Sequence, residues 1–475
     1  MTAGTRASIP AAGKRTPGYL VRPVAMEPAE AAARLRVLDG FVWLDSSAGA
    51  ERMGRYSYMA ACPRVTLRAE GERLAIAPRN GSAREVRSNP WDALARWGRP
   101  RRTAATPGLP PFRGGLIGYL GYDLGRHLEA VPATIPLEPG PPDMVFGVYG
   151  WVLAFDHLSG EAWLIAWQGE SESAAAEAEL DYVEALLSAP ARPAGAFRLT
   201  RAPVSRTPRD EYCAAVERAL DYIRAGDIYQ VNLSHRLESE WHGDPFALFS
   251  GLRHGAPVPY GAYLDFGETK LLSASPERFL RLEGGYVETR PIKGTRPRGA
   301  GAKSDREMAA ELLTSEKDRA ENLMIVDLLR NDLGRVCRIG TVSVPEMFAL
   351  EGFSNVWHLV STVTGILRAG LGPVDLLRAC FPGGSVTGCP KIRAMQVIEE
   401  LEPVRRGPYC GAIFAMGHDG FMESSITIRT IVLHGERLWL QAGGAIVADS
   451  EPAAEHDETM AKAASALAAI AGVSG

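Results

Sequence analysis

The most restrictive feature of this 475-residue sequence is the way its strand-like and helix-like segments are grouped. Short apolar stretches at 260–266, 270–275 and 278–283, the last followed by Gly284-Gly285, predict consecutive β-hairpins. Helical patterns are gathered in a few places instead of alternating with every strand. This grouping predicts an α+β fold, in which antiparallel β-sheets pack together and helices lie outside, and it argues against a Rossmann alternation.

The first half of the sequence predicts mostly strands. The turn at 156–160 separates two of them, at 144–155 and 162–167. Glycines in 114–122 would let backbones approach closely. The remaining segments are strands at 41–44, 56–61 and 65–67, a short helix at 90–97 and an Ala/Glu-rich helix at 173–187.

In the second half, helix-start signals separate further strands. Thr207-Pro208 predicts a helix with Thr207 as N-cap, ending at Gly226. A capping box at 304–307 predicts helical sequence that restarts near Ser315 and runs to about Leu333. Strands are expected at 409–416, 425–433 and 437–442, and a last helix near 450–452.

These patterns divide the chain into a flexible tail (1–18), an N-terminal domain (19–188), a linker (189–206) and a catalytic domain (207–475). The tail has basic residues but no apolar segment like that of a signal peptide. The linker has prolines and scattered arginines without periodicity. The two domains are expected to use up the sequence, which leaves no room for a fused glutaminase.

The composition narrows the class of protein. An apolar content of 46% and a charged content of 23% are typical of a folded globular protein. A net charge of −4 gives no reason to expect nucleic acid or an anionic membrane as partner. No apolar run is long enough for a membrane helix. The six cysteines form no C-x-x-C pair, which fits a reducing cytoplasm and suggests no zinc site.

Lys293 lies in the run Arg290-Pro291-Ile292-Lys293-Gly294-Thr295, and Arg296 and Arg298 follow. An ordinary lysine titrates at about 10.4, and nearby cations lower its pKa. A lysine with a lowered pKa can act as a covalent nucleophile. The alternative, from this run alone, is a solvated basic loop.

Carboxylates recur on two predicted helices. Glu321 begins an apolar stripe that continues through Met324, Ile325, Leu328 and Leu329, so it should need a partner. That partner is either a distant arginine or a ligand. On the last helix, Glu451, Glu455 and Glu458 share one face, which is a solvated acidic stripe unless a cation joins them. Two such helices would suit Mg²⁺, with an anionic substrate completing its coordination.

Two glycine-rich segments are candidates for anion binding. The loop at 381–388 precedes Pro390-Lys391, where a helix start could bind an anion through backbone N–H groups. The loop has neither P-loop nor G-x-G-x-x-G spacing. Gly443-Gly444 is interpreted as a strand-to-turn segment, which could equally be a plain turn.

From about Tyr212 to Ile470 the sequence resembles the chorismate-utilising enzymes. The N-terminal half matches more loosely, through segments at 54–57, 114–123 and 155–157. The matching motifs of the second half are Gly226 to Leu233, Ser275 to Phe279, Asp318 to Asp327, His358 to Ser361, Phe381 to Met395, Ile426 to Thr430 and Ala442 to Gly444.

The family adds ammonia at C4, ammonia at C2 or water at C2 of chorismate, and two positions indicate which. Gln230 occupies the position of the lysine that activates water in the water-using members. Lys293 occupies the position where anthranilate synthases have alanine and where aminodeoxychorismate synthases have lysine. The resemblance thus implies conversion of chorismate and ammonia to 4-amino-4-deoxychorismate, for 4-aminobenzoate and folate synthesis, through a covalent lysine adduct. The alternatives are anthranilate synthase component I activity and a non-catalytic chorismate or amino-acid sensor.

The same resemblance implies roles for individual residues. Lys293 would be the nucleophile and Glu277 the general acid. Glu321 and Glu458 would bind Mg²⁺, with Glu455 as a further or water-mediated ligand. The substrate-binding residues would be Arg429, Tyr409, Gly443, Gly444, His358, Thr387, Lys391 and Gln230. For His358, a purely structural role is the open alternative.

Regulation and partners are also implied. Leu44-Asp45-Ser46-Ser47 resembles the segment that binds inhibitory tryptophan in anthranilate synthases, but Asp45 replaces the usual glutamate. We therefore do not expect tryptophan to act here, although Asp45, Ser46 and Ser47 remain the candidate regulatory residues. A separate glutamine amidotransferase subunit would supply the ammonia.

Overall fold

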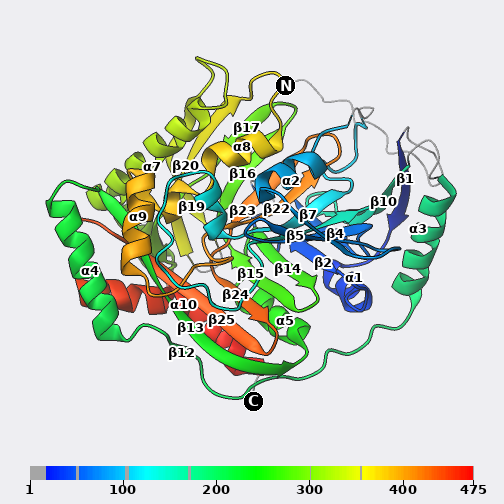
Figure 1. Ribbon diagram of the computed structural model, residues 1–475, viewed down its shortest axis with the longest axis horizontal. Helices are drawn as coiled ribbons and strands as arrows, with labels where there is room; N and C mark the ends of the chain where they lie inside the picture. The colour runs from blue at the N-terminus through cyan, green and yellow to red at the C-terminus, as the bar shows by residue number, and fades with distance from the viewer. Residues whose placement is uncertain are drawn as a thin grey trace.

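The computed structural model describes residues 18–49, 53–101, 106–168, 173–299, 301–353 and 356–473. The expected flexible tail at 1–18 lies outside these ranges, apart from Gly18. Within them the chain forms two large antiparallel sheets with helices on their outer faces (Figure 1). The expected α+β fold is confirmed. No helix among the described residues is both long enough and apolar enough to span a membrane.

The first sheet contains thirteen of the described strands. They are β1 (Tyr19–Val24), β2 (Val42–Asp45), β3 (Tyr56–Ala60), β9 (Trp151–Asp156), β10 (Glu161–Trp167), β11 (Phe197–Leu199), β12 (Val204–Ser205), β13 (Gln230–Gly243), β14 (Tyr260–Phe266), β15 (Thr269–Ser275), β21 (Gly388–Cys389), β24 (Thr430–His434) and β25 (Arg437–Ile446). Their order is β1-β10-β9-β3-β2-β14-β15-β24-β25-β13-β11, and β12 and β21 also pair with β13.

The second sheet contains twelve described strands. They are β4 (Val65–Glu70), β5 (Arg73–Pro78), β6 (Arg84–Arg87), β7 (Gly115–Leu120), β8 (Met144–Tyr149), β16 (Arg278–Glu283), β17 (Tyr286–Thr289), β18 (Ile292–Pro297), β19 (Ser343–Gly352), β20 (Val356–Ile366), β22 (Ala412–Gly417) and β23 (Met422–Ile426). Their order is β18-β20-β17-β16-β23-β22-β7-β8-β4-β5-β6, and β19 also pairs with β20.

The helices lie around the two sheets (Figure 1). They are α1 (Pro28–Leu35), α2 (Pro90–Trp97), α3 (Ser173–Ser188), α4 (Arg209–Arg224), α5 (Pro245–Gly255), α6 (Ala302–Thr314), α7 (Glu316–Gly334), α8 (Pro373–Cys380), α9 (Lys391–Leu401) and α10 (Pro452–Val473), with the 3-10 turns η1 (Tyr122–His127) and η2 (Gly384–Val386). Helix α2 shows why such segments form: Asn89 caps Trp91 N–H at 2.9 Å, Pro90 follows it, and Trp91 and Leu94 are buried.

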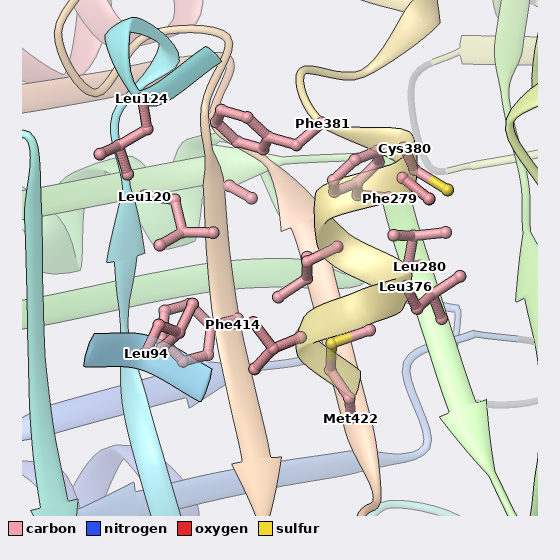
Figure 2. Packing of buried hydrophobic residues seen from close by; sticks show 14 of the residues in the cluster. Leu94, Leu120, Leu124, Phe279, Leu280, Leu376, Cys380, Phe381, Phe414 and Met422 are labelled. Atoms are coloured by element: carbon pink, nitrogen blue, oxygen red, sulfur yellow. The ribbon is translucent and has the colours of Figure 1, made fainter. Parts of the chain in front are cut away.

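The apolar core has three main layers. One cluster joins the facing sides of the two sheets and includes Tyr119, Val152 and Ile413. A second packs α1, α3, α5 and α10 against the first sheet. The third packs α2, α7 and α8 against the second sheet; Figure 2 shows Leu94 of α2 and Leu376 of α8 in this layer. Two stacked sheets, each covered outside by helices, bury apolar residues on both faces of every central strand.

Where the chain changes sheets, the sequence pattern was misleading. The segment 144–155 is two strands, because β8 lies in the second sheet and β9, beginning after Gly150, lies in the first. The segment 425–433 divides in the same way between β23 and β24. The expected hairpin of 270–275 with 278–283 is wrong, since β15 and β16 belong to different sheets. Apolar periodicity is the same on either side of such a crossing.

Helix starts were predicted to within a few residues. Ser315 caps α7 by accepting Asp318 N–H at 3.2 Å, and α10 begins at Pro452 as expected. Pro208 rather than Thr207 is the N-cap of α4. Helix α6 begins at Ala302, so Ser304 is its third residue and not its N-cap. The Ser304 hydroxyl accepts a hydrogen bond from Gly301 N–H at 3.1 Å. The predicted capping box at 304–307 is therefore wrong.

The division into domains at 189–206 stays a prediction. Both sheets contain strands from either side of this segment. Within it, β11 and β12 pair with β13. The two halves of the sequence therefore share their sheets.

Candidate active site

Two neighbouring segments connect the sheets, and each carries an expected site residue. Pro276-Glu277 joins β15 to β16, and Thr427 to Arg429 joins β23 to β24. The two crossings are bonded together, because the Ser275 hydroxyl donates to the Ile426 carbonyl at 2.6 Å and Ile426 N–H donates to the Glu277 carbonyl at 3.1 Å. Glu277 and Arg429 are thereby held at the same boundary between the sheets.

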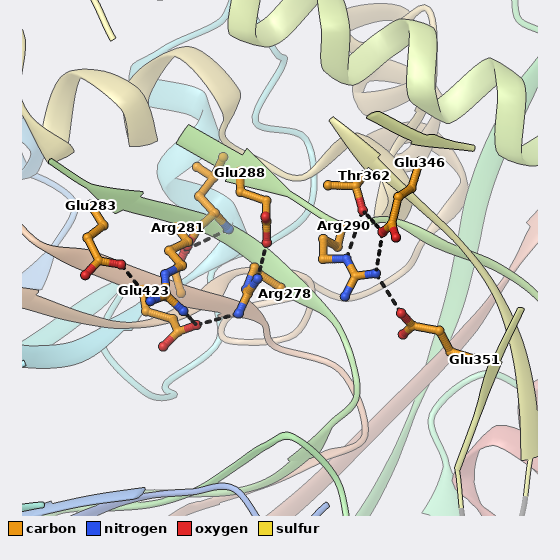
Figure 3. Close-up of polar contacts among 11 residues, drawn as sticks. Arg278, Arg281, Glu283, Glu288, Arg290, Glu346, Glu351, Thr362 and Glu423 are labelled. Carbon is orange, nitrogen blue, oxygen red and sulfur yellow. Dashed lines mark hydrogen bonds and ion pairs between the residues drawn. The ribbon is translucent and has the colours of Figure 1, made fainter. Parts of the chain in front are cut away.

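Two buried arginines anchor the segments that carry Glu277 and Lys293 (Figure 3). Arg278, next to Glu277, pairs with Glu288 and donates to Glu423 at 3.0 Å. Arg290, just before the Lys293 segment, donates to Glu351 at 2.6 Å and to the Thr362 hydroxyl at 3.1 Å. Charge-assisted hydrogen bonds of this kind fix the backbone beside them.

Glu277 is buried and has the pKa of a group that can exchange protons near neutrality. Burial raises the pKa of its carboxyl to about 7. The Ser385 hydroxyl, which donates to Oε1 at 2.6 Å, and the nearby Lys293 ammonium act in the opposite direction. A carboxyl with this pKa can serve as general acid at physiological pH.

Lys293 lies at an irregularity of β18, where the pairing with β20 shifts between Ile292 and Thr295. Gly294 supplies the positive φ, 83°, of this bulge. The Lys293 ammonium donates to the Ser385 carbonyl at 3.3 Å. The side chain thus points toward the segment that also contacts Glu277.

The pKa of Lys293 is lowered, but not for the reason that the sequence suggested. Burial is the largest cause, and the Lys462 ammonium adds to it, whereas Glu321, Glu277 and Glu458 oppose it. The arginines that follow Lys293 are engaged elsewhere. Arg296 pairs with Glu311 and Asp318, and Arg298 pairs with Asp305.

Glu321 lies beside the buried face of α7 rather than on it. The buried side chains of this helix are Asn322, Ile325, Val326, Leu329, Asp332 and Leu333. Glu321 is half-buried, and burial raises its pKa while the ammonium of Lys293 lowers it. The largest opposite charge acting on Glu321 is therefore the Lys293 ammonium and not the distant arginine that the sequence suggested; no hydrogen bond joins the two side chains among the described residues.

The acidic face of α10 reaches the same region. Glu458 is exposed and paired with Lys462 at 2.6 Å, and the exposed Glu451 stands just before the helix, which begins at Pro452. Glu455 is buried: its Oε1 accepts from the Ser450 hydroxyl at 2.6 Å, whereas its Oε2 has no hydrogen-bond partner among the described residues. A buried carboxylate oxygen without a donor is costly unless a cation or donor reaches it.

A hard cation at these carboxylates would need further oxygen ligands besides them. Within the described residues, no three His, Cys, Asp or Glu side chains come together as a metal-binding group. Mg²⁺ is often bound through only one or two carboxylates plus waters and substrate oxygens. The charge of Glu458 on α10 acts on the pKa of Glu321 on α7, and both carboxylates act on the pKa of Lys293.

Gly443 and Gly444 lie inside β25, not in a turn. Because side chains alternate along a strand, they face opposite sides. A Cβ at Gly443 would come within 2.8 Å of the Tyr409 hydroxyl, and one at Gly444 within 3.0 Å of Glu455 Oε2. The missing side chains leave space next to two predicted site residues.

Arg429 and His358 lie close enough together for the Arg429 charge to act on the His358 ring. Arg429 has a positive φ of 52°, which is uncommon for a residue with a side chain, and it forms no ion pair with any described residue. Burial lowers its pKa. His358 is neutral, because burial and the Arg429 charge lower its pKa to about 4, and its Nδ1 lies 3.0 Å from the Thr295 hydroxyl.

Gln230 and Thr427 are among the buried polar side chains that lack partners in the described chain. Both amide atoms of Gln230, at the start of β13, have none. The hydroxyl of Thr427, in the crossing beside Arg429, also has none. Sequence reasoning missed Thr427 and Ser385, although both stand inside the matched motifs. The sequence motifs do not say in which direction each of these side chains points.

Thr387 and Lys391 have protein partners. The Thr387 hydroxyl donates to the Gly383 carbonyl at 3.0 Å. The Lys391 ammonium donates to Asp332 at 2.6 Å and to the Cys380 carbonyl at 2.9 Å. Asp332 is eleven positions beyond Glu321 on α7, about 16 Å along the helix axis. The substrate-binding roles expected for these residues stay predictions.

The candidate regulatory residues have protein partners of their own. Asp45 is buried and paired with Arg253 at 2.8 Å. Ser46 donates to the Pro259 carbonyl at 2.8 Å, and Ser47 to that of Val258 at 3.3 Å. Asp45 and Ser46 also line a small cavity between the sheets. Whether these residues bind a regulator stays a prediction.

Comparison with known proteins places this geometry in a family. A family model described as chorismate binding enzyme matches residues 40–468. The chain is 48% identical to anthranilate synthase component 1 of Thermus thermophilus over 369 residues, 77% of this chain and 79% of that one. It is 46% identical to aminodeoxychorismate synthase component 1 of Salmonella typhimurium over 352 residues, 74% and 76% of the two chains. The solved anthranilate synthase component I of Streptococcus pneumoniae TIGR4 superimposes with a TM-score of 0.75 at 34% identity, covering 87% of this chain and 92% of that one.

The chain therefore belongs to the family of chorismate-binding enzymes. Relatives that carry the two different names match at similar identity. Overall similarity does not choose between their reactions, so the choice depends on individual residues of the site.

Proposed function

We propose that this chain aminates chorismate at C4, giving 4-amino-4-deoxychorismate. The observation that carries the proposal is the placement of Lys293, whose ammonium bonds the same residue, Ser385, that bonds Glu277. A lysine of lowered pKa beside a carboxyl of pKa about 7 is the combination that nucleophilic attack with acid-assisted loss of a hydroxyl requires.

The reaction would proceed in two displacements. Neutral Lys293 attacks C2, the ring double bonds shift, and the C4–O bond breaks while Glu277 gives its proton to the departing hydroxyl, which leaves as water. Ammonia then attacks C4, the double bonds shift back, and the C2–N bond breaks. Lys293 and, after proton transfer from the incoming amine, Glu277 return to their starting states.

Mg²⁺ would be held by Glu321 and Glu458, with Glu455 as a further or water-mediated ligand. When bound, it would neutralise and orient the ring carboxylate of chorismate. Glu458 would exchange its present partner, Lys462, for the ion. The orphaned Oε2 of Glu455 supports a cation or donor in this position.

Arg429 and the Gly443-Gly444 backbone would bind the remaining carboxylate and the ring, together with Tyr409. An unpaired guanidinium suits a planar carboxylate, which it can bond with two parallel hydrogen bonds. Gln230, whose amide lacks partners, would contact the substrate as a neutral donor and acceptor; it cannot activate water as a base.

The ammonia would come from a glutamine amidotransferase subunit, as the name component 1 of the relatives suggests. The product would feed 4-aminobenzoate and folate synthesis in the cytoplasm. The nearest rival is anthranilate synthesis by amination at C2, for which no lysine nucleophile is needed. A non-catalytic sensor is less well supported, because it would have no use for a lysine of lowered pKa beside a proton donor.

The experiment is incubation of the purified chain with chorismate, Mg²⁺ and an ammonium salt, with and without an aminodeoxychorismate lyase. Products are separated by chromatography and identified by mass. Lyase-dependent 4-aminobenzoate is the expected result. Fluorescent 2-aminobenzoate without lyase would instead establish anthranilate synthesis. Absence of any amine product, even with an added amidotransferase, would favour the sensor.

A further inference from the structure

The segment 383–387 packs tightly between β23 and α7. A Cβ on Gly383 would come within 2.5 Å of the Ile426 side chain in β23, and one on Gly384 within 2.6 Å of Leu328 in α7. Only glycine fits at both positions without displacing a neighbour. The segment thus passes between α7 and the end of β23, directly beside the crossing that carries Glu277.

Hydrogen bonds hold this segment from both ends. The Thr387 hydroxyl donates to the carbonyls of Gly383 and Gly384, at 3.0 and 3.3 Å. The buried guanidinium of Arg406 donates to the Val386 carbonyl at 3.0 Å. Ser385, in the middle, therefore has a fixed backbone and a buried side chain.

Ser385 contacts both proposed reacting groups, with different parts of the residue. Its hydroxyl donates to Glu277 Oε1 at 2.6 Å, and its carbonyl accepts from the Lys293 ammonium at 3.3 Å. One residue thereby bridges a segment at the β15–β16 crossing and the bulge of β18. Neither the names of the relatives nor the proposed reaction assigns a role to Ser385.

We propose that Ser385 is a positioning residue, which sets the separation and orientation of Glu277 and Lys293 and holds the Glu277 carboxyl in the rotamer that faces the departing hydroxyl. The inference rests on the proposed function. The Ser385 hydroxyl also lowers the pKa of Glu277, because a hydrogen-bond donor stabilises the ionised carboxyl. Removing it should raise the pKa of Glu277 further above its ordinary value.

The groups that act electrostatically on Glu277 and Lys293 come from several elements. Lys293 on β18 is the cation that acts on Glu277. The thiol of Cys410, on the segment before β22, is neutral because burial raises its pKa to about 12, and it interacts with Glu277 electrostatically. Around Lys293 lie Glu321 on α7 and Glu458 and Lys462 on α10. None of these is altered by a change of the Ser385 side chain.

The test compares three variants. Ser385→Ala removes the hydroxyl and keeps the carbonyl, and Ser385→Thr keeps both. Ser239→Ala is the matched control, because Ser239 is also buried and donates one short hydrogen bond, 2.6 Å, to the carbonyl of Arg201 at the far end of β13. Thermal unfolding checks that each variant is folded.

The primary measurement is infrared titration of the Glu277 carboxyl, identified as the band that Glu277→Gln removes. In Ser385→Ala we expect its midpoint to rise by about one pH unit, since a hydrogen bond to a charged group contributes roughly that much. We expect kcat to fall about 10- to 100-fold, as for other misplaced reacting groups, with KM for chorismate little changed. The limb of the kcat profile near pH 7 should move to higher pH, and Ser385→Thr should restore most of these values.

An unchanged Glu277 midpoint in Ser385→Ala, or a loss of kcat no larger than that of Ser239→Ala, would overturn the proposal. The infrared result does not depend on which product forms. If the unaltered chain made 2-aminobenzoate, the proposed function would fail while the Glu277 titration still showed whether Ser385 governs that carboxyl. If the chain made the C4 amine and the midpoint did not move, only the Ser385 proposal would fail.

Discussion

The ammonium of Lys391 lies 2.6 Å from a carboxylate oxygen of Asp332, and both side chains are buried. This ion pair links the start of α9 to the last turns of α7. It uses the charge of a lysine that the sequence assigned to substrate binding. Asp332 therefore neutralises Lys391 without any ligand. A substitution of Lys391 can separate this structural role from substrate binding.

Lys391→Met should destabilise the protein and leave KM for chorismate nearly unchanged. Breaking one side of a buried pair leaves an uncompensated charge, at a cost of about 3–5 kcal/mol. Urea unfolding measures the loss, and Lys391→Met/Asp332→Asn should recover much of it, since the orphaned charge is gone. A large rise in KM with unaltered stability would instead support the substrate-binding role.

Glu277 makes the stability of the fold depend on pH. Its pKa rises from an ordinary 4.5 to about 7 in the folded chain, so the folded state binds more protons than the unfolded state between these values. Its protonated form therefore stabilises the fold at low pH, and this contribution, about 3 kcal/mol, is lost as pH rises from 4.5 through 7. Glu277→Gln should remove this dependence.

The measurement is the free energy of unfolding of both forms at pH 5 and pH 8. We expect the glutamine variant to match the unaltered protein at the lower pH and to exceed it at the higher. The kcat of the glutamine variant should fall sharply at both pH values. Parallel pH curves for the two proteins would show that Glu277 titrates normally.

Lys293→Ala should abolish formation of the C4 amine, because the covalent route requires the lysine nitrogen. Some direct amination at C2 would remain, since ammonia can still reach the bound ring. Chromatography of products from chorismate and ammonium measures both outcomes. Thr295→Ser, which changes a nearby side chain of β18 without removing its hydroxyl, serves as control. Full retention of the C4 product by Lys293→Ala would eliminate the nucleophile role.

The sequence predicted the fold class and singled out Glu277, Lys293 and Arg429 as candidate site residues, but it did not predict the connections between the sheets that carry them. The local sequence pattern predicts the pairing of a hairpin such as 260–266 with 270–275. It does not predict where the chain crosses from one sheet to the other. Residues 425–433 have the pattern of one apolar strand, although Arg429 lies where the chain passes between the sheets. The positions of Glu277 and Arg429 therefore depend on long-range pairing that local periodicity does not contain.

The environment of Lys293 shows the same limit. The sequence indicated a lowered pKa from neighbouring arginines, whereas burial and Lys462, which is far along the chain, lower it. Acidic residues near in sequence neutralise those arginines. The direction of the shift was foreseeable from the residue types, but its cause depends on tertiary contacts.

Glu321→Gln should weaken Mg²⁺ binding in the presence of chorismate. The variant keeps the shape of the side chain but removes the charge that a hard cation prefers. Calorimetric titration with Mg²⁺, with and without chorismate, is the measurement. Glu451→Gln, at the exposed residue just before α10, is the control and should leave Mg²⁺ binding unchanged. An unchanged Mg²⁺ affinity would remove Glu321 from the metal site.

Arg406 connects the loop of Ser385 to the first sheet, and its loss should destabilise both. Its guanidinium pairs with Glu402 at 2.6 Å and donates to the carbonyls of Val386 and Asn232. Arg406 and Glu402 are almost completely buried.

Arg406→Met should therefore cost about 3–5 kcal/mol, because the Glu402 charge stays buried without its partner. In Arg406→Met/Glu402→Gln the charge is gone, and the amide oxygen can still accept the hydrogen bonds that Glu402 receives from the backbone and hydroxyl of Ser234. Urea unfolding should show that the double variant regains a large part of the loss. Its kcat should nevertheless stay low, since the Val386 carbonyl has lost its donor and the segment that orients Ser385 is free to shift. Equal stability of the single and double variants would show that the loss comes from the backbone contacts of Arg406 and not from the buried charge.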